Sequence, residues 1–176
     1  MKKYILRWEI AGIVFVFLLG ALLHFVFEWS GNSVIVGAIA SVNESVWEHF
    51  KQGYWPMCLF AAIEYRFFRS YTSNFLAAKG MAIILLPVIT GLIFYTYTSF
   101  TGEEILVVDI ATFAVAITIV QLISYKIMTS TRMTKFSNNI GLAAIVVVGL
   151  ILIIFTFVPP HWPILLDKNT GLYGIP

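Results

Sequence analysis

Residues 140–158 have the sequence IGLAAIVVVGLILIIFTFV, a stretch without a single charged residue. A helix needs about 20 apolar residues to cross the hydrocarbon core of a bilayer, so this stretch decides the fold. Comparable apolar stretches lie at residues 5–27, 81–100 and 105–125. The whole chain of 176 residues is 60% hydrophobic and 11% charged, with a mean hydropathy of +0.90. The sequence therefore predicts a membrane protein built from helices.

A fifth span is predicted at residues 53–68, although it is short and the preceding residues 44–52 are also compatible with helix. We therefore predict an all-α, polytopic transmembrane helix bundle of five spans that forms one membrane domain over the whole chain. The linkers are short, apart from an outer loop at residues 28–52 and an outer tail at residues 159–176. Within this loop, residues 33–42 are apolar but too few to span, and they predict a sixth, re-entrant or interfacial helix.

The basic residues orient the predicted bundle, because cytoplasmic loops carry an excess of Lys and Arg. Nine of the eleven basic residues fall near span ends that share one side if five spans alternate across the membrane: Lys2, Lys3, Arg7, Arg66, Arg69, Lys79, Lys126, Arg132 and Lys135. Lys51 and Lys168 fall on the other side. We therefore expect a multi-pass protein of the cell membrane, with a cytoplasmic N-terminus and an outer C-terminus. The first span is too long for a signal peptide and is expected to be retained.

Other composition features exclude several classes of protein. Cys58 is the only cysteine, so the chain forms no intramolecular disulfide and no cysteine-based metal motif. The net charge is only +2, and the basic residues lie in short segments flanking the spans. This pattern does not favour nucleic-acid binding, and the partner that we expect is membrane lipid.

The histidines and most acidic residues gather on the predicted outer side. This set contains all three histidines and seven of the nine acidic residues: His24, Glu28, Glu44, Glu48, His49, Glu103, Glu104, Asp109, His161 and Asp167. Ionisable groups at membrane depth are costly, and they usually face a bundle interior or a cavity. The outer end of the bundle is therefore the expected place for a functional site.

The residue types in this set favour a metal site. Zinc binds His nitrogen and carboxylate oxygen, and a catalytic zinc keeps three protein ligands and a water. Calcium, magnesium or manganese would also accept the carboxylates. His24 and Glu28 are four residues apart and share a helical face, as do Ser45 and His49. The predicted metal ligands are His24, His49, His161, Asp109, Glu28 and Asp167, and the predicted catalytic residues are Glu48 as general base, Glu44 and Ser45.

Each of these residues also has an ordinary structural interpretation. His24 can hydrogen-bond to a carbonyl at the membrane interface, and Glu48 can pair with Lys51. Asp109 lies where an acid favours the dipole of a helix N-terminus. Toward the cytoplasm, Glu64 can pair with Arg66 or mark one end of an ion pathway.

The segment SVNESVWEHFK at residues 41–51, together with the tail from His161 to Gly174, resembles an uncharacterised family of small bacterial integral membrane proteins. That resemblance covers most of the chain and implies no activity. A looser likeness is to the membrane hydrolase superfamily that includes alkaline ceramidases, which hold zinc with three histidines. Ser45 and His49 match its Ser-x-x-x-His element, but the chain lacks a His-x-x-x-His pair and has five predicted spans where that superfamily has seven.

Three hypotheses follow for the function. The first is a metal-dependent membrane hydrolase that acts on a lipid or lipid-linked substrate. The second is a small transporter, or a substrate-binding membrane subunit, for a cation or a cationic solute, with coupling to protons through the carboxylates and histidines. The third is an accessory or scaffold protein in which the polar residues only close the bundle.

Overall fold

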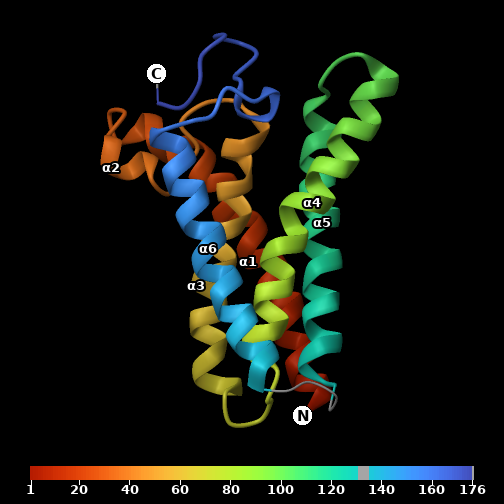
Figure 1. Cartoon of the computed structure of the whole chain (residues 1–176). Helices are drawn as coiled ribbons and strands as arrows, with labels where there is room; N and C mark the ends of the chain where they lie inside the picture. The colour runs from red at the N-terminus through yellow and green to blue at the C-terminus, as the bar shows by residue number, and fades with distance from the viewer. Residues whose placement is uncertain (131–134, 176) are drawn as a thin grey trace.

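The computed structural model describes residues 1–130 and 135–175, and their secondary structure is helical (Figure 1). The α-helices are α1 (Lys2–Trp29), α2 (Val34–Gly37), α3 (Val46–Phe68), α4 (Phe75–Thr101), α5 (Leu106–Met128) and α6 (Lys135–Phe157), followed by a 3-10 turn η1 (Pro163–Leu165). The described residues contain no β-strand, only an isolated antiparallel bridge between Leu166 and Tyr173. The prediction of an all-helical chain is confirmed.

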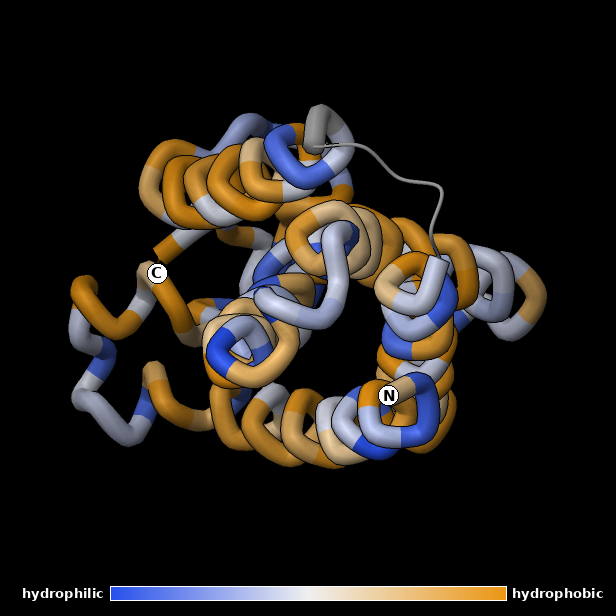
Figure 2. The backbone as a smooth tube through the Cα atoms, turned by 90° about the horizontal axis from the view of Figure 1, so that it is seen from below, coloured by the Kyte–Doolittle hydropathy of each residue, from blue (hydrophilic) through white to orange (hydrophobic). Residues whose placement is uncertain are grey.

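The five long helices run between two ends of the molecule (Figure 1). α1 packs against α3 and α5, α4 packs against α5 and α6, and α3 also contacts α4 and α6. The N-terminus and the α3–α4 turn lie at one end, and α2, the α4–α5 turn and the C-terminal tail lie at the other. Viewed from the N-terminal end, the helices are mainly hydrophobic along their length (Figure 2). This apolar surface is suited to contact with lipid.

Within residues 1–130 and 135–175, four helices are long and apolar enough to cross a membrane, namely α1, α4, α5 and the Ser137–Phe157 part of α6. α3 is equally long but does not belong with these four. It contains several charged residues, and Glu48, Lys51 and Glu64 among them are buried inside the bundle. The fifth predicted span is therefore a helix of different character: Glu48 and Lys51 pair with each other within it, and Glu64 pairs with Lys79 of α4.

Two boundaries differ from the predicted ones. α3 begins at Val46 rather than near residue 53, because Ser45 caps the helix by accepting a hydrogen bond at Oγ from Glu48 N, 3.3 Å away. The predicted re-entrant helix at residues 33–42 is reduced to α2, which is a single turn. A segment of this length lies at the end of the bundle and does not enter it as a re-entrant helix.

Several of the basic residues that predict the orientation lie near the N-terminal end of the bundle. Lys2 and Lys3 are at the start of α1, and Arg66 and Arg69 are at the end of α3. Of the nine residues used to orient the chain, Arg132 lies outside the described residues, and the side chain of Lys135 is also not described. Which end faces the cytoplasm stays a prediction from the positive-inside rule.

A pair of glycines lets α4 and α6 approach closely. A Cβ atom on Gly80 would meet the backbone of Gly141, and a Cβ atom on Gly141 would meet the backbone of Leu76 and Ala77. Small residues at such crossings allow membrane helices to bring their backbones into contact. This contact joins α4 and α6 near the N-terminal end of the bundle.

The C-terminal tail folds back over the opposite end. Leu165 is buried, and Ile175 packs against a small cluster formed by Phe27, Ala40 and Val42. Asn43 Nδ2 donates a hydrogen bond of 2.8 Å to the carbonyl of Gly174. The tail and the loop after α2 therefore form one cover over the ends of α1 and α3.

Candidate metal centre

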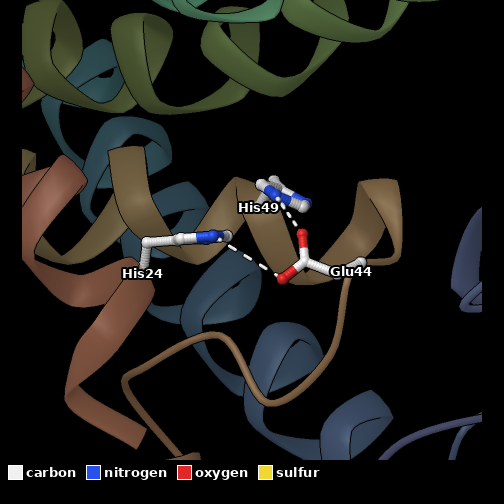
Figure 3. Close-up of side chains that lie close together, drawn as sticks. All are labelled: His24, Glu44 and His49. Carbon is white, nitrogen blue, oxygen red and sulfur yellow. Dashed lines mark ion pairs between the residues drawn. The ribbon is translucent and has the colours of Figure 1, made fainter. Parts of the chain in front are cut away.

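Three side chains from separate elements lie close together at this end of the bundle (Figure 3). His24 lies near the end of α1, Glu44 lies in the loop before α3, and His49 lies in the first turn of α3. His24 Nε2 is 3.6 Å from Glu44 Oε1, and His49 Nε2 is 3.5 Å from Glu44 Oε2. One potential ligand atom from each residue lies within 4.8 Å of the other two.

These spacings are close to those of a tetrahedral metal site. Donor atoms about 2.0–2.1 Å from a tetrahedral zinc are about 3.3 Å apart. The two nitrogen–oxygen separations exceed this value by 0.2–0.3 Å, but each involves a different oxygen of Glu44. With one donor atom per residue, the three atoms lie within 4.8 Å of one another, and the two histidine rings have centroids 5.4 Å apart. Small side-chain movements would therefore bring two imidazoles and one carboxylate around a common ion. A fourth position would remain for water.

The other ring nitrogen of His49 is held by the backbone. Nδ1 lies 2.8 Å from the carbonyl oxygen of Ser45, to which it donates a hydrogen bond. Metal-binding histidines are commonly fixed by a carbonyl in this way, because the bond sets the ring orientation and leaves Nε2 for the metal. Glu44 Oε2 stands opposite that nitrogen, so His49 has the environment of a ligand.

His24 is held by a side-chain network instead. Its Nδ1 lies 2.9 Å from Gln52 Nε2, and the same amide nitrogen is 3.1 Å from Ser41 Oγ. Ser41 in turn donates to the Glu48 carbonyl, 3.0 Å away. In this arrangement the proton of neutral His24 resides on Nε2. A metal at Nε2 requires the reverse arrangement, in which Nδ1–H donates to the Gln52 amide oxygen, so metal binding would be coupled to a half-turn of that amide.

Glu44 joins the two rings electrostatically. Hydrogen bonding to His49 lowers the pKa of the Glu44 carboxyl group below its ordinary value of 4.5, while partial burial acts in the opposite direction and is outweighed. The charges of His24 and His49 add to the lowering. The side chains are partly exposed, at 29% for His24, 36% for His49 and 49% for Glu44. A solvated ion could therefore reach the cluster.

A polar cavity of about 230 Å³ adjoins the cluster. His24 and Glu44 line it together with Glu28 and Asp167, so four of the predicted site residues surround one space. This volume has room for several water molecules. Glu28 follows His24 by one helical turn, is exposed, and acts electrostatically on it. The carboxylates place negative charge around the cavity.

Two predicted catalytic residues serve the fold. Glu48 is buried, with Oε2 at 2.5 Å from Lys51 Nζ and 3.1 Å from Val42 N, and with Oε1 accepting from Thr156. That is the environment of a structural ion pair rather than of a general base. The hydroxyl of Ser45 caps α3, and its carbonyl positions His49.

The remaining predicted ligands lie around the cluster without joining it. Among the described residues, the group of close ligand atoms does not include His161, whose ring lies 4.6 Å from that of Tyr173. Asp109 accepts a hydrogen bond from Tyr97 and acts electrostatically on His49. Asp167 orders its own turn by accepting from Asn169 N and Thr170 Oγ1. The structure thus assembles two of the three histidines.

Sequence reasoning missed Gln52 and the buried pairing of Lys79 with Glu64 and Glu9, whereas the pair of Glu48 with Lys51 was one of its stated alternatives. Gln52 lies three residues after His49, a spacing that places both near one face of α3, and this was an available signal. Glu64 pairs with Lys79 rather than with exposed Arg66. No local signal in the sequence links Glu64 to α4.

An apolar crevice opens beside the same end of α3. Its volume is about 840 Å³, and it is lined by residues of α3, α4 and α6 with Ile164 of η1. Phe50 lines the crevice and directly follows His49, so the crevice and the cluster lie on neighbouring faces of one helical turn. Leu92 and Phe100 on its lining are largely exposed. The crevice is therefore open at the apolar outer surface of the bundle.

Comparison with protein families identifies one match that spans almost the whole chain. Residues 1–175 match the family described as a family of unknown function, DUF6512, and the chain belongs to this family. No curated protein and no solved structure matches the chain. The comparisons therefore support membership of an uncharacterised family, and they add no support for the likeness to the alkaline-ceramidase superfamily.

Proposed function

We propose that this DUF6512 protein binds one divalent metal ion, of the kind that zinc represents, through His24, Glu44 and His49. The observation that carries the proposal is the set of three donor atoms within 4.8 Å of one another. Two imidazoles and one carboxylate form the ligand set of several catalytic zinc sites, in which the fourth position holds a water. The carbonyl that fixes His49 provides the usual support for such a ligand.

The reaction that this centre supports best is hydrolysis. A bound zinc lowers the pKa of its water to about 7 and so generates a nucleophile at neutral pH. Glu28, on the wall of the adjoining cavity, is the exposed carboxylate placed to accept a proton there. In this assignment Glu28 replaces Glu48 as the general base, because Glu48 is committed to Lys51.

A lipid or lipid-linked molecule is the substrate class that fits best. The crevice of about 840 Å³ is apolar and borders α3 beside the cluster. Its volume falls in the range of about 300–1,000 Å³ that is usual for small-molecule sites. An acyl chain in the crevice and a polar head group near the cavity would place a bond between them close to the metal centre.

Metal analysis of the detergent-purified protein tests this proposal. We expect about one divalent ion per chain in the wild type, loss of the ion in His49→Ala, and retention in the matched variant His161→Ala, because His161 lies outside the cluster. If the ion is found, Glu28→Gln should keep it and lose turnover on a panel of membrane lipids. Absence of metal from the wild type after growth and purification with added zinc would overturn the proposal.

Transport of a cation is the second candidate, and the acidic cavity favours it. Glu28, Glu44 and Asp167 around one polar space would attract a cation. This candidate predicts saturable, rapidly reversible binding and uptake into vesicles, whereas the hydrolase predicts a tightly held ion and product formation. A purely structural cluster would instead show reduced stability in His24→Ala and His49→Ala, with no ion and no solute bound by the wild type.

A further inference from the structure

The bundle contains a second group of charged residues at the end far from the metal centre. Lys79 Nζ on α4 lies 2.9 Å from Glu9 Oε1 on α1 and 2.5 Å from Glu64 Oε2 on α3. All three side chains are 0–3% exposed. Ser124 on α5 donates a 2.7 Å hydrogen bond to Glu9 Oε1. Four helices thus contribute to one buried polar group.

The charges in this group do not balance. Two carboxylates share one ammonium, which leaves one negative charge inside an apolar bundle if both acids are ionised. Lys79 and Glu9 are the charged groups that act on Glu64, and from α5 the facing group is the neutral Ser124 hydroxyl. Transfer of an uncompensated carboxylate from water to such surroundings costs several kcal/mol. A bound proton removes that charge.

The oxygen atoms give a second, independent indication. Glu9 Oε2 and Glu64 Oε1 are buried and have no hydrogen-bond partner among the described residues. Buried polar atoms are rarely left in that state. A neutral carboxyl group costs less to bury without a partner than a carboxylate does, because no charge is removed from water.

The ion pair between Glu48 and Lys51, near the other end of α3, differs from this group in its charge balance. Glu48 is matched by a single lysine, Lys51, and its two oxygens are satisfied by Lys51, Val42 N and Thr156. That pair is neutral without a proton. Both groups are buried to the same extent. They differ because the Lys79 group has two carboxyl groups for one lysine, whereas the Lys51 pair has one.

We propose that Glu9, Glu64 and Lys79 form a proton-binding site, in which one of the two carboxyl groups carries a proton at neutral pH. Titration of two such close acids belongs to the pair rather than to either residue. Removal of either acid leaves one carboxylate facing one ammonium, and the site then needs no proton. This inference goes beyond the metal-dependent reaction and does not depend on it.

Infrared spectroscopy of the detergent-purified full chain tests the site. We expect the wild type at neutral pH to show the carbonyl stretching band of a protonated carboxyl group, with the shift in heavy water that an exchangeable proton gives. Glu64→Gln and Glu9→Gln should each abolish this band. The matched variants Glu48→Gln and Glu103→Gln should keep it, since Glu48 is paired one to one and Glu103 is exposed.

Stability at different pH values gives a second readout. A site that binds its proton more tightly in the folded state than in the unfolded state loses stabilisation as pH rises. The melting temperature of the wild type should fall as pH rises from the acid range, where the unfolded carboxyl groups lose their protons, through neutral, and that dependence should be flattened in Glu64→Gln. A wild-type spectrum without the band, or a band that both glutamine variants retain, would overturn the proposal. A band that disappears when sodium replaces choline in the buffer would identify a metal-cation site and would also overturn it.

Discussion

Lys51 Nζ lies 2.5 Å from Glu48 Oε2, one turn earlier in α3, and both side chains are almost completely buried. The same ammonium group donates to the carbonyl of Gly37, 2.7 Å away, and to Thr156 Oγ1, 3.0 Å away. Lys51 therefore ties α2, α3 and α6 together at the end that carries the candidate metal centre. Its position explains why a helix with charged residues can lie at the centre of an apolar bundle.

Replacement of Lys51 should be among the most destabilising changes in the chain. Lys51→Met leaves Glu48 as an uncompensated buried charge, which typically costs about 3–5 kcal/mol. Adding Glu48→Gln to this variant should recover part of the loss, because the stranded charge is then removed. Thermal unfolding in detergent measures both effects. The control is Lys168→Met, which breaks an exposed 2.9 Å pair with Glu104 and should cost less than about 1 kcal/mol.

Gln52→Leu should weaken metal binding without removing a ligand. The substitution deletes the amide that holds His24 Nδ1, and loss of such a supporting partner typically lowers metal affinity by about 10–100-fold. Competition with a chelating dye measures the affinity. An unchanged affinity would show that His24 is oriented by other contacts or does not bind the metal. Gln52→Glu, which keeps an acceptor for Nδ1–H, should retain more affinity than Gln52→Leu.

The α4–α6 crossing should tolerate no side chain. In Gly141→Ala the new Cβ would clash with the backbone of Leu76 and Ala77, and backbone cannot move aside as cheaply as a side-chain tip. We expect a loss of about 1–3 kcal/mol, the usual range for overpacking. Gly91→Ala is the matched control, since its Cβ would lie 3.7 Å from Phe50, an ordinary contact. Equal melting temperatures for the two variants would contradict the close approach.

The contribution of Glu44 to stability should depend on pH in the acid range. The pKa of this carboxyl group is lowered in the folded state, chiefly by its hydrogen bond to His49. Its stabilising effect is therefore fully present above the ordinary pKa of 4.5 and is lost as pH falls through the lowered value. In metal-free protein, wild type should be more stable than Glu44→Gln near neutral pH, by at most about 1 kcal/mol because the group is half exposed. The difference in melting temperature should vanish in acid.

The helical architecture could be predicted because the bilayer imposes it. Uncharged stretches such as residues 140–158 have few alternatives to a spanning helix, and the boundaries of α6 and α1 agree with the predicted ones to within a few residues. The start of α3 could not be placed in this way. Residues 46–52 include four polar residues, and their helical state depends on the Ser45 cap and on partners of Glu48 and Lys51 that lie partly on other elements.

The candidate site could be predicted in part. The sequence predicts His24 and His49 as metal ligands and Glu44 as a catalytic residue, and the structure brings these three side chains together. Their assembly depends on how the loop before α3 returns to α1, which helical spacing within one element does not determine. The exclusion of His161 follows from the path of the tail, where the ring packs on Tyr173.

The crevice between α4 and α6 also has a kinetic consequence. Because exposed residues such as Leu92 and Phe100 form part of its lining, a hydrophobic molecule would enter it sideways, by two-dimensional diffusion within one leaflet. The encounter rate would then follow the mole fraction of that molecule in the bilayer rather than its solubility in water. Dilution with inert detergent or lipid at constant bulk concentration would slow capture, so assays of this protein should be scaled to surface concentration.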